Sequence, residues 1–376
     1  MTSPPYGETA DRRGLLRGAA EAGARVRTAA RHAAEAGIAD LHPEGRPRAV
    51  LVAGPGTAAA AVADLIGALA GASAPVVRLQ PTGVAPAAGA LRWALPGWAG
   101  SVDLLLLPTT DGSEPGLALL AEQAYRRGIT VVAVAPKASP LTEAVSGSRG
   151  LFVPMAIAPN EAPNEYAENI AASPGTLWAL FTPLLMLLDR VGLLEAPPEA
   201  LEKVADRLDR TAERCGPAIA TYSNPAKTLA AELADSLPLI WTEGAAAGPA
   251  GRRFAAVLAE LAGLPALAAE LPEALPAHGV LLAGDYAAGA DPEDFFRDRV
   301  EEPQALRARV VLLRDRPSDG LTAAHAAREL ALSHETAISE LEPEEGGDLE
   351  TLAELLAVTD FAAVYLCLAT PGRTAL

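Results

Sequence analysis

The sequence predicts an α/β protein made of two doubly wound parallel-sheet domains, with further helices near both ends. Three observations predict this class. A chain of 376 residues is too long for one ordinary core. Half of its residues are hydrophobic but only 4% are aromatic, so its cores are built from Ala, Leu and Val. Short apolar runs also alternate with helix-like segments, and this alternation restarts near the middle of the chain. We expect a helical segment at 1–40, a first domain at 41–195 and a second domain with the C-terminal helix at 196–376.

The first half begins with helix and continues with strands. Apolar residues recur near helical spacing within 11–38, which predicts one or two amphipathic helices. Five apolar runs follow, at 49–54, 75–79, 102–108, 129–136 and 150–155. Their continuous apolar character is typical of parallel strands covered on both faces. The segments between them are helix-like and end in Gly, which predicts crossover helices.

The second half repeats the alternation after a Pro- and Asn-rich loop. The apolar run at 176–188 is too short to span a bilayer and contains Pro183, so we expect a buried helix there. A charged helix is expected at 200–214, and a long buried helix at 349–369. We expect strands at 237–241, 279–285 and 308–315, with helices between them.

Charge and cysteine usage limit the possible partners. The chain has 30 basic and 47 acidic residues, a net charge of −17, which argues against binding to nucleic acid or to an anionic membrane. Cys215 and Cys367 show no CxxC spacing, which predicts free thiols in a reducing compartment. The N-terminal residues lack the apolar segment of a signal peptide. We therefore expect a cytoplasmic protein. The histidines show no metal-binding spacing, so no metal or other cofactor is expected.

Two turns after predicted strands could bind an anion. At the first, Gly54, Gly56 and Thr57 begin an Ala-rich helix, where backbone N–H groups can point at a ligand. The turn is neither GxGxxG nor a P-loop, so it does not predict a nucleotide site. At the second, Thr109, Gly112 and Ser113 precede a helix. Both turns could instead be ordinary connections, with the polar residues serving as helix caps.

A third group of residues lies in the second half. Arg253 precedes Phe254 on a predicted helix, Glu260 lies seven residues further on, and His278 precedes the predicted strand at 279–285. A carboxylate and an imidazole can together move a proton between carbon atoms and open a sugar ring. The alternatives are a solvated helix acid for Glu260 and a structural histidine for His278.

The order Asn224-Pro225-Ala226-Lys227, strand, Arg253-Phe254, Glu260 and His278 resembles the bifunctional phosphoglucose/phosphomannose isomerases. This family has two sugar-isomerase (SIS) domains, and the resemblance covers roughly residues 10–370. It implies two SIS-like domains, Glu260 and His278 as catalytic groups, and a homodimer with sites at its interface. It also implies that a sugar phosphate binds to the two turns and to Arg253.

The sequence departs from the family at four places. Pro55 and Thr57 interrupt the Gly-Met-Gly-Gly-Ser turn, and Asp111 and Glu114 stand where the second turn has hydroxyl residues. Asn160 takes the place of an arginine. The family's closing Leu-Lys is not found, and Arg373 is the cation nearest to its expected place.

Two functions therefore remain open. The first is isomerisation of glucose 6-phosphate or mannose 6-phosphate with fructose 6-phosphate, at low activity or none. The second is non-catalytic binding of a carbohydrate derivative, or a regulatory role, by a SIS-type protein.

Overall fold

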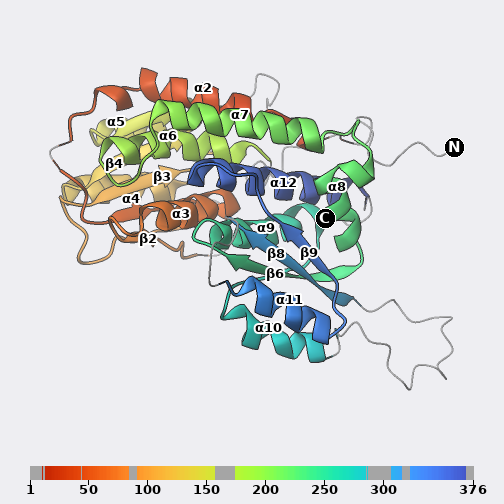
Figure 1. Ribbon diagram of the computed structural model, residues 1–376. Helices are drawn as coiled ribbons and strands as arrows, with labels where there is room; N and C mark the ends of the chain where they lie inside the picture. The colour runs from red at the N-terminus through yellow and green to blue at the C-terminus, as the bar shows by residue number, and fades with distance from the viewer. Residues whose placement is uncertain are drawn as a thin grey trace. The chain divides into compact units, whose positions relative to one another are not determined.

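The computed structural model describes residues 11, 13–43, 45–83, 91–156, 174–284, 286, 306–315 and 322–369. Contacts divide the chain into a first unit, Arg13–Glu213, and a second unit that begins at Arg214. Each unit contains one parallel sheet with helices on both faces (Figure 1). The predicted fold class is therefore confirmed. The predicted domain limits after residues 40 and 195 stay a prediction.

The first sheet has five strands in the order β2-β1-β3-β4-β5, all parallel. Each apolar run predicted to be a strand forms one: β1 Val50–Val52, β2 Val76–Arg78, β3 Leu104–Pro108, β4 Thr130–Ala135 and β5 Leu151–Pro154. The strands β1, β3 and most of β4 are buried, which explains their continuous apolar sequence.

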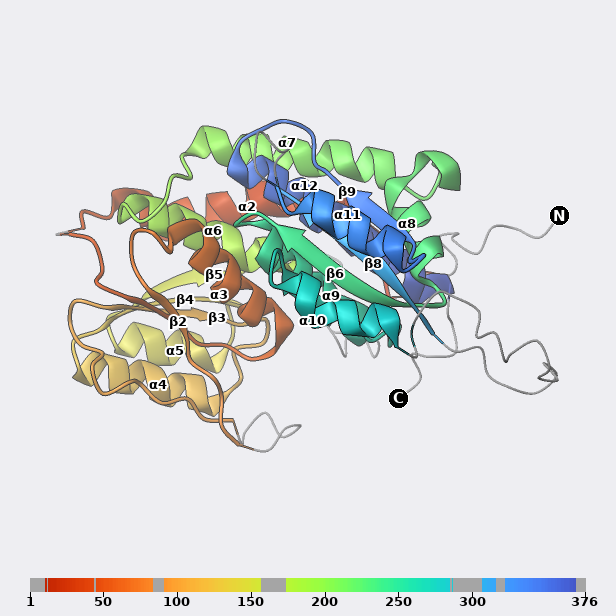
Figure 2. The same cartoon turned by 60° about the horizontal axis from the view of Figure 1, so that its bottom comes forward.

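Helices cover both faces of this sheet (Figure 2). On one face, α4 (Pro115–Arg126) and α5 (Pro140–Gly147) pack over Leu, Val and Ala side chains of β1, β3 and β4. The opposite face carries α3 (Gly56–Ala70) and α6 (Thr176–Arg190). The remaining helices are α1 (Leu15–Ala20), α2 (Ala22–Glu35), the 3-10 turn η2 (Ile38–Asp40) and α7 (Pro198–Cys215). The predicted N-terminal helices and the buried helix at 176–188 are confirmed.

The second sheet has the order β7-β6-β8-β9, again all parallel. Its strands are β6 (Ser236–Glu243), β7 (Leu267–Glu270), β8 (Arg307–Arg314) and β9 (Ile338–Leu341). One face is covered by α9 (Ala247–Ala262), which packs together with α12 (Asp348–Ala369) and α8 (Pro225–Leu233); η5 (Thr221–Ser223) precedes α8. The other face is covered by α10 (Ala274–Ala283) and α11 (Ala324–Ser333), as Figure 1 shows.

One predicted strand of the second unit is wrong. The run expected as a strand at 279–285 belongs instead to helix α10, as far as residue 283. The edge strand is the earlier segment β7, whose sequence is Leu-Ala-Ala-Glu. Alanine has a low strand propensity, so this strand gives little sequence signal. The helix is apolar on all sides and therefore lacks the period that distinguishes a helix from a buried strand.

The final helix, α12, is long and apolar enough to cross a membrane by length and composition alone. However, 89% of its most apolar window is buried within the protein. It packs against α8 and α9 of its own unit. The helix therefore has the environment of a core helix, as the sequence predicts.

Candidate ligand site

The two predicted anion-binding turns meet at the carboxyl edge of the first sheet. In a doubly wound sheet, ligands bind where the strand order reverses, and here that point lies between β1 and β3. The turn after β1 and the loop after β3 touch each other. A Cβ atom added to Gly54 would lie 2.2 Å from the carbonyl oxygen of Pro108. Gly56 has a φ of 74°, a conformation that favours glycine.

The loop from Thr109 to Glu114 satisfies its own polar groups. The Thr109 hydroxyl donates to the Glu114 carboxylate at 3.2 and 3.3 Å. The Thr109 Oγ1 atom also accepts the backbone N–H of Gly112 at 3.0 Å and that of Asp111 at 3.3 Å. Ser113 donates its hydroxyl to the Asp111 carboxylate. The predicted donors of this loop are therefore directed at the loop itself.

Packing holds the loop in this conformation. Gly112 has a φ of 70°, and an added Cβ atom would lie 2.6 Å from Ser139. The Gly112 carbonyl accepts the backbone N–H of Leu141 at 3.1 Å, near the start of α5. Glycine is therefore required here, and the loop is anchored to the next helix.

Glu114 gives the loop an unusual electrostatic character. The residue is only 5% exposed. Burial raises the pKa of its carboxyl group, and the neighbouring Asp111 raises it further, while hydrogen bonds from its own backbone and from Thr109 lower it. A buried carboxyl group thus lies in the loop that the resemblance predicts to bind a sugar phosphate.

Arg253 lies in the second unit and has a buried partner. Its guanidinium group binds both oxygens of Asp360 on α12, one of them at 3.2 Å. The two residues are 5% exposed each. Burial raises the pKa of Asp360, and Arg253 lowers it. Since breaking such a pair leaves one buried charge uncompensated, Arg253 joins α9 to α12 and is not presented to solvent.

Glu260 lies two helical turns after Arg253, near the end of α9. The residue is exposed in this single chain. Nearby protein atoms still raise the pKa of its carboxyl group through desolvation, and Arg253 lowers it. A raised pKa suits a group that transfers protons near neutral pH.

His278 lies on the opposite face of the second sheet from Glu260. It belongs to α10, not to a loop as expected, and its Nδ1 atom accepts the indole N–H of Trp241 at 2.8 Å. Both rings belong to the layer beneath α10 and α11, whereas α9 covers the other face. Burial lowers the pKa of His278, so the neutral imidazole is favoured. Within one chain the sheet therefore separates Glu260 from His278.

Two carboxylates, those of Asp315 and Glu243, lie at the carboxyl edge of the second sheet, and the sequence did not predict them. Asp315, directly after β8, accepts the backbone N–H of Ala246 at 2.8 Å, where α9 begins. Glu243, at the end of β6, accepts from the Thr322 hydroxyl at 2.6 Å and from the Ala323 N–H at 2.7 Å, before α11. Acids from strand ends thus cap two helices. The sequence signal that could have indicated these carboxylates is Gly244 directly after β6 and Asp315 directly after β8.

Two further positions noted in the sequence cannot be compared with the structure. Asn160, in the place of an arginine of the resembled family, and Arg373, the cation nearest to that family's closing Leu-Lys, both lie outside the described residues. Among the residues that the structure describes, no three His, Cys, Asp or Glu side chains gather as a metal site would require. Cys215 and Cys367 are buried free thiols, and burial raises the pKa of Cys215 to about 11.

Known proteins resemble this chain in part of its sequence and in its fold. Residues 222–371 match the family described as the bacterial phospho-glucose isomerase C-terminal SIS domain. The matched segment spans most of the second unit. No curated protein sequence matches the chain.

Solved structures extend the similarity of fold to nearly the whole chain. A glucose-6-phosphate isomerase like protein from Thermus thermophilus is 18% identical, with 98% of this chain and 94% of that chain covered and a TM-score of 0.53. A protein from Clostridium difficile, described as a putative phosphosugar isomerase, is 12% identical, with 95% and 93% covered and a TM-score of 0.65. The C-terminal domain of glucosamine-fructose-6-phosphate aminotransferase from Francisella tularensis is 12% identical, with 96% and 97% covered and a TM-score of 0.56. At these identities the likeness shows the fold.

Proposed function

We propose that this chain is a SIS-type protein that binds a carbohydrate derivative at the carboxyl edge of its first sheet and does not turn over hexose phosphates. The observation that carries this proposal is the buried Glu114 carboxyl group, which holds the Thr109 hydroxyl inside the loop. The SIS-type segment and the sugar-phosphate proteins among the structural neighbours support a carbohydrate ligand.

Electrostatics argue against a phosphate dianion in this loop. A carboxylate and a phosphate charge at about 4 Å repel by roughly 4 kcal/mol at an effective dielectric constant of about 20. Asp111 adds a second negative charge, and the Thr109 hydroxyl would have to leave Glu114 before it could donate to a ligand. A ligand with neutral hydroxyl groups avoids the repulsion.

The second candidate function is phosphoglucose or phosphomannose isomerisation at low activity. The match of residues 222–371 to a phosphoglucose isomerase domain favours it, as does the raised pKa of Glu260. Because the second sheet separates Glu260 from His278 in one chain, this function requires the two groups to come from different copies. Trp241 occupies the Nδ1 atom of His278, so Nε2 would have to carry the proton transfer. Loss of a single positioned donor costs an enzyme about 3–4 kcal/mol, so little turnover is expected.

Calorimetric titration and a coupled isomerase assay separate the two candidates. The protein is titrated with fructose 6-phosphate and with fructose, and the same preparation is assayed for interconversion of the hexose phosphates. We expect no turnover, and dissociation constants for fructose 6-phosphate of about 1 mM or weaker.

Two substitutions sharpen this test. Glu114→Gln removes the buried charge and retains an oxygen that can accept from Thr109, so binding of fructose 6-phosphate should strengthen. Glu122→Gln, on the exposed surface of α4, is the matched control and should change nothing. Micromolar affinity of the unmodified protein, or turnover at about 1–1,000 per second, would contradict the proposal and favour the isomerase.

A further inference from the structure

A cavity lies in the second unit at the carboxyl ends of β6 and β7. Its volume is about 350 Å³, and its lining residues come from these strands, from α9 and from the segment just before α10. Sites for small molecules commonly have volumes of about 300–1,000 Å³. The cavity is therefore large enough for a small ligand, and none of its described lining residues belongs to the loop at 109–114.

The cavity combines a small, mostly apolar interior with a charged mouth. Four lining residues are buried or half-buried, namely Thr242, Gly248, Ala268 and Ala269. Three lining residues are exposed and charged, namely Arg252, Glu270 and Glu273. A ligand that fits this lining has charged ends joined by an apolar part.

Two of the charged groups at the mouth hold each other in place. The Glu270 carboxylate, at the end of β7, accepts a hydrogen bond from Nη1 of Arg252 on α9 at 2.5 Å. A Cβ atom added to Gly248 would lie 2.6 Å from the Oε1 atom of Glu270, so glycine leaves room for this carboxylate beside the helix. The strand and the helix thus fix one cation and one anion side by side.

The charges at the mouth indicate the class of ligand. The described lining residues contribute one guanidinium group and two carboxylates. The complementary ligand carries one carboxylate and two cationic groups. A basic α-amino acid such as lysine has this set near neutral pH, and methylene groups join its ends. The charge of the unit favours the same class, since residues 214–376 contain 12 basic and 25 acidic residues, a net of −13.

We propose that this cavity binds a basic α-amino acid such as lysine, independently of the carbohydrate site proposed above. The ligand carboxylate shares the Arg252 guanidinium group with Glu270, because a guanidinium group carries five N–H donors in a planar fork that suits carboxylates. The α-ammonium group binds Glu270 and the side-chain ammonium group binds Glu273. The methylene groups contact Ala268 and Ala269, so each part of the ligand meets a lining of matching character.

Calorimetric titration of the full chain with L-lysine and three analogues tests this assignment. Norleucine lacks the side-chain ammonium group, Nα-acetyl-lysine lacks the charge of the α-ammonium group, and lysinamide lacks the carboxylate. We expect a dissociation constant below about 1 mM for L-lysine, and each analogue should bind at least about tenfold more weakly.

Two substitutions connect groups of the ligand with their partners. Arg252→Ala should weaken binding of L-lysine at least about tenfold and abolish its preference over lysinamide. Glu273→Gln should abolish the preference for L-lysine over norleucine. Both side chains are exposed, and Glu273 makes no side-chain capping bond to α10, so the melting temperature should stay close to that of the unmodified protein.

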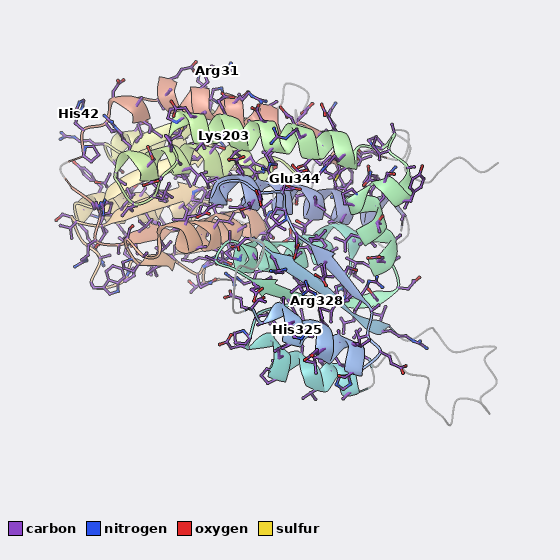
Figure 3. The ribbon with its side chains drawn as sticks, viewed as in Figure 1. Arg31, His42, Lys203, His325, Arg328 and Glu344 are labelled. Carbon is purple, nitrogen blue, oxygen red and sulfur yellow. The ribbon has the colours of Figure 1, made fainter. Side chains whose placement is uncertain are left out.

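The matched control is Arg328→Ala, which removes another exposed arginine that is paired with a glutamate. Arg328, labelled on α11 in Figure 3, donates to Glu340 at 2.6 and 2.7 Å and does not line the cavity. This variant should bind L-lysine like the unmodified protein. The proposal is overturned if L-lysine does not bind at up to about 10 mM, or if its affinity survives both substitutions unchanged. Tighter binding of lysinamide than of L-lysine would also overturn it, since that order indicates unspecific attraction of cations.

Discussion

At the scale of single residues, Glu114 places a buried carboxyl group in the loop that follows β3. The residue caps no helix with its side chain and pairs with no cation in the described part of the chain. Its contacts are the Thr109 hydroxyl and the loop backbone. The sequence identified Glu114 as a poor neighbour for a phosphate. It did not predict that the carboxyl group would be buried and bound to the expected donor.

Glu114 should make stability depend on pH. Because its pKa is raised in the folded protein, stability falls as the pH rises from the ordinary range of a glutamate, about 4.3, through the raised value. Glu114→Gln should therefore melt about 2–4 °C above the unmodified protein near neutral pH, with the difference vanishing at acid pH. Calorimetric melting across pH measures this. An equal gain from Glu122→Gln would show that the effect does not come from burial.

His278 should depend on pH in the opposite direction. Its pKa is lowered by burial, so its contribution to stability is present above the ordinary value for histidine, about 6.5, and is lost as the pH falls through the lowered value. His278→Leu should cost about 1–3 kcal/mol at neutral pH, because the Trp241 N–H loses its acceptor. The variant should also lose less stability than the unmodified protein on acidification. Urea denaturation at several pH values, with the exposed His42→Leu as control, tests both effects.

At the scale of elements, acids at strand ends fix the starts of helices in the second unit. Gly244 has a φ of 114°, and an added Cβ atom would lie 1.8 Å from the Asp315 carboxylate. That carboxylate accepts the Ala246 N–H. The turn between β6 and α9 therefore requires glycine for two reasons. Its φ is positive, and a larger side chain would overlap the Asp315 carboxylate.

Gly244→Ala should destabilise the protein by about 3 kcal/mol, since it adds backbone strain and forces Asp315 from its site. Gly147→Ala is the control, because nothing lies within 4 Å of the added atom and the position is helical. Its effect should stay within about 1 kcal/mol. Denaturant unfolding measures both; similar losses would refute the steric argument.

The elements also show where sequence patterns succeed and where they fail. Buried strands such as β3 and β4 were predictable, because a parallel strand covered on both faces is apolar throughout. Helix α10 was mistaken for a strand because its outer surface is apolar too. An amphipathic period appears only when one side of a helix faces water.

At the scale of the whole molecule, charge is unevenly distributed. Residues 13–213 contain 17 basic and 20 acidic residues, a net of −3, whereas residues 214–376 carry −13. Self-repulsion destabilises a compact unit and is screened by salt. Raising the salt concentration from about 0.01 M to 0.2 M should therefore slow hydrogen exchange in the second unit more than in the first. Exchange read by mass spectrometry tests this, and an equal response of both units would contradict it.

The sequence by itself determined the class of fold and its two parallel sheets. These follow from the period and length of apolar runs and from a few motif residues, all of which are local in the chain. Only the tertiary structure decided which hydrogen-bond donors remain available to a ligand. Thr109 is turned toward Glu114, Arg253 toward Asp360 and the Trp241 N–H toward His278. The last two pairs join residues far apart in sequence, and in each case burial, which no local pattern encodes, decides whether a polar group serves a ligand or the fold.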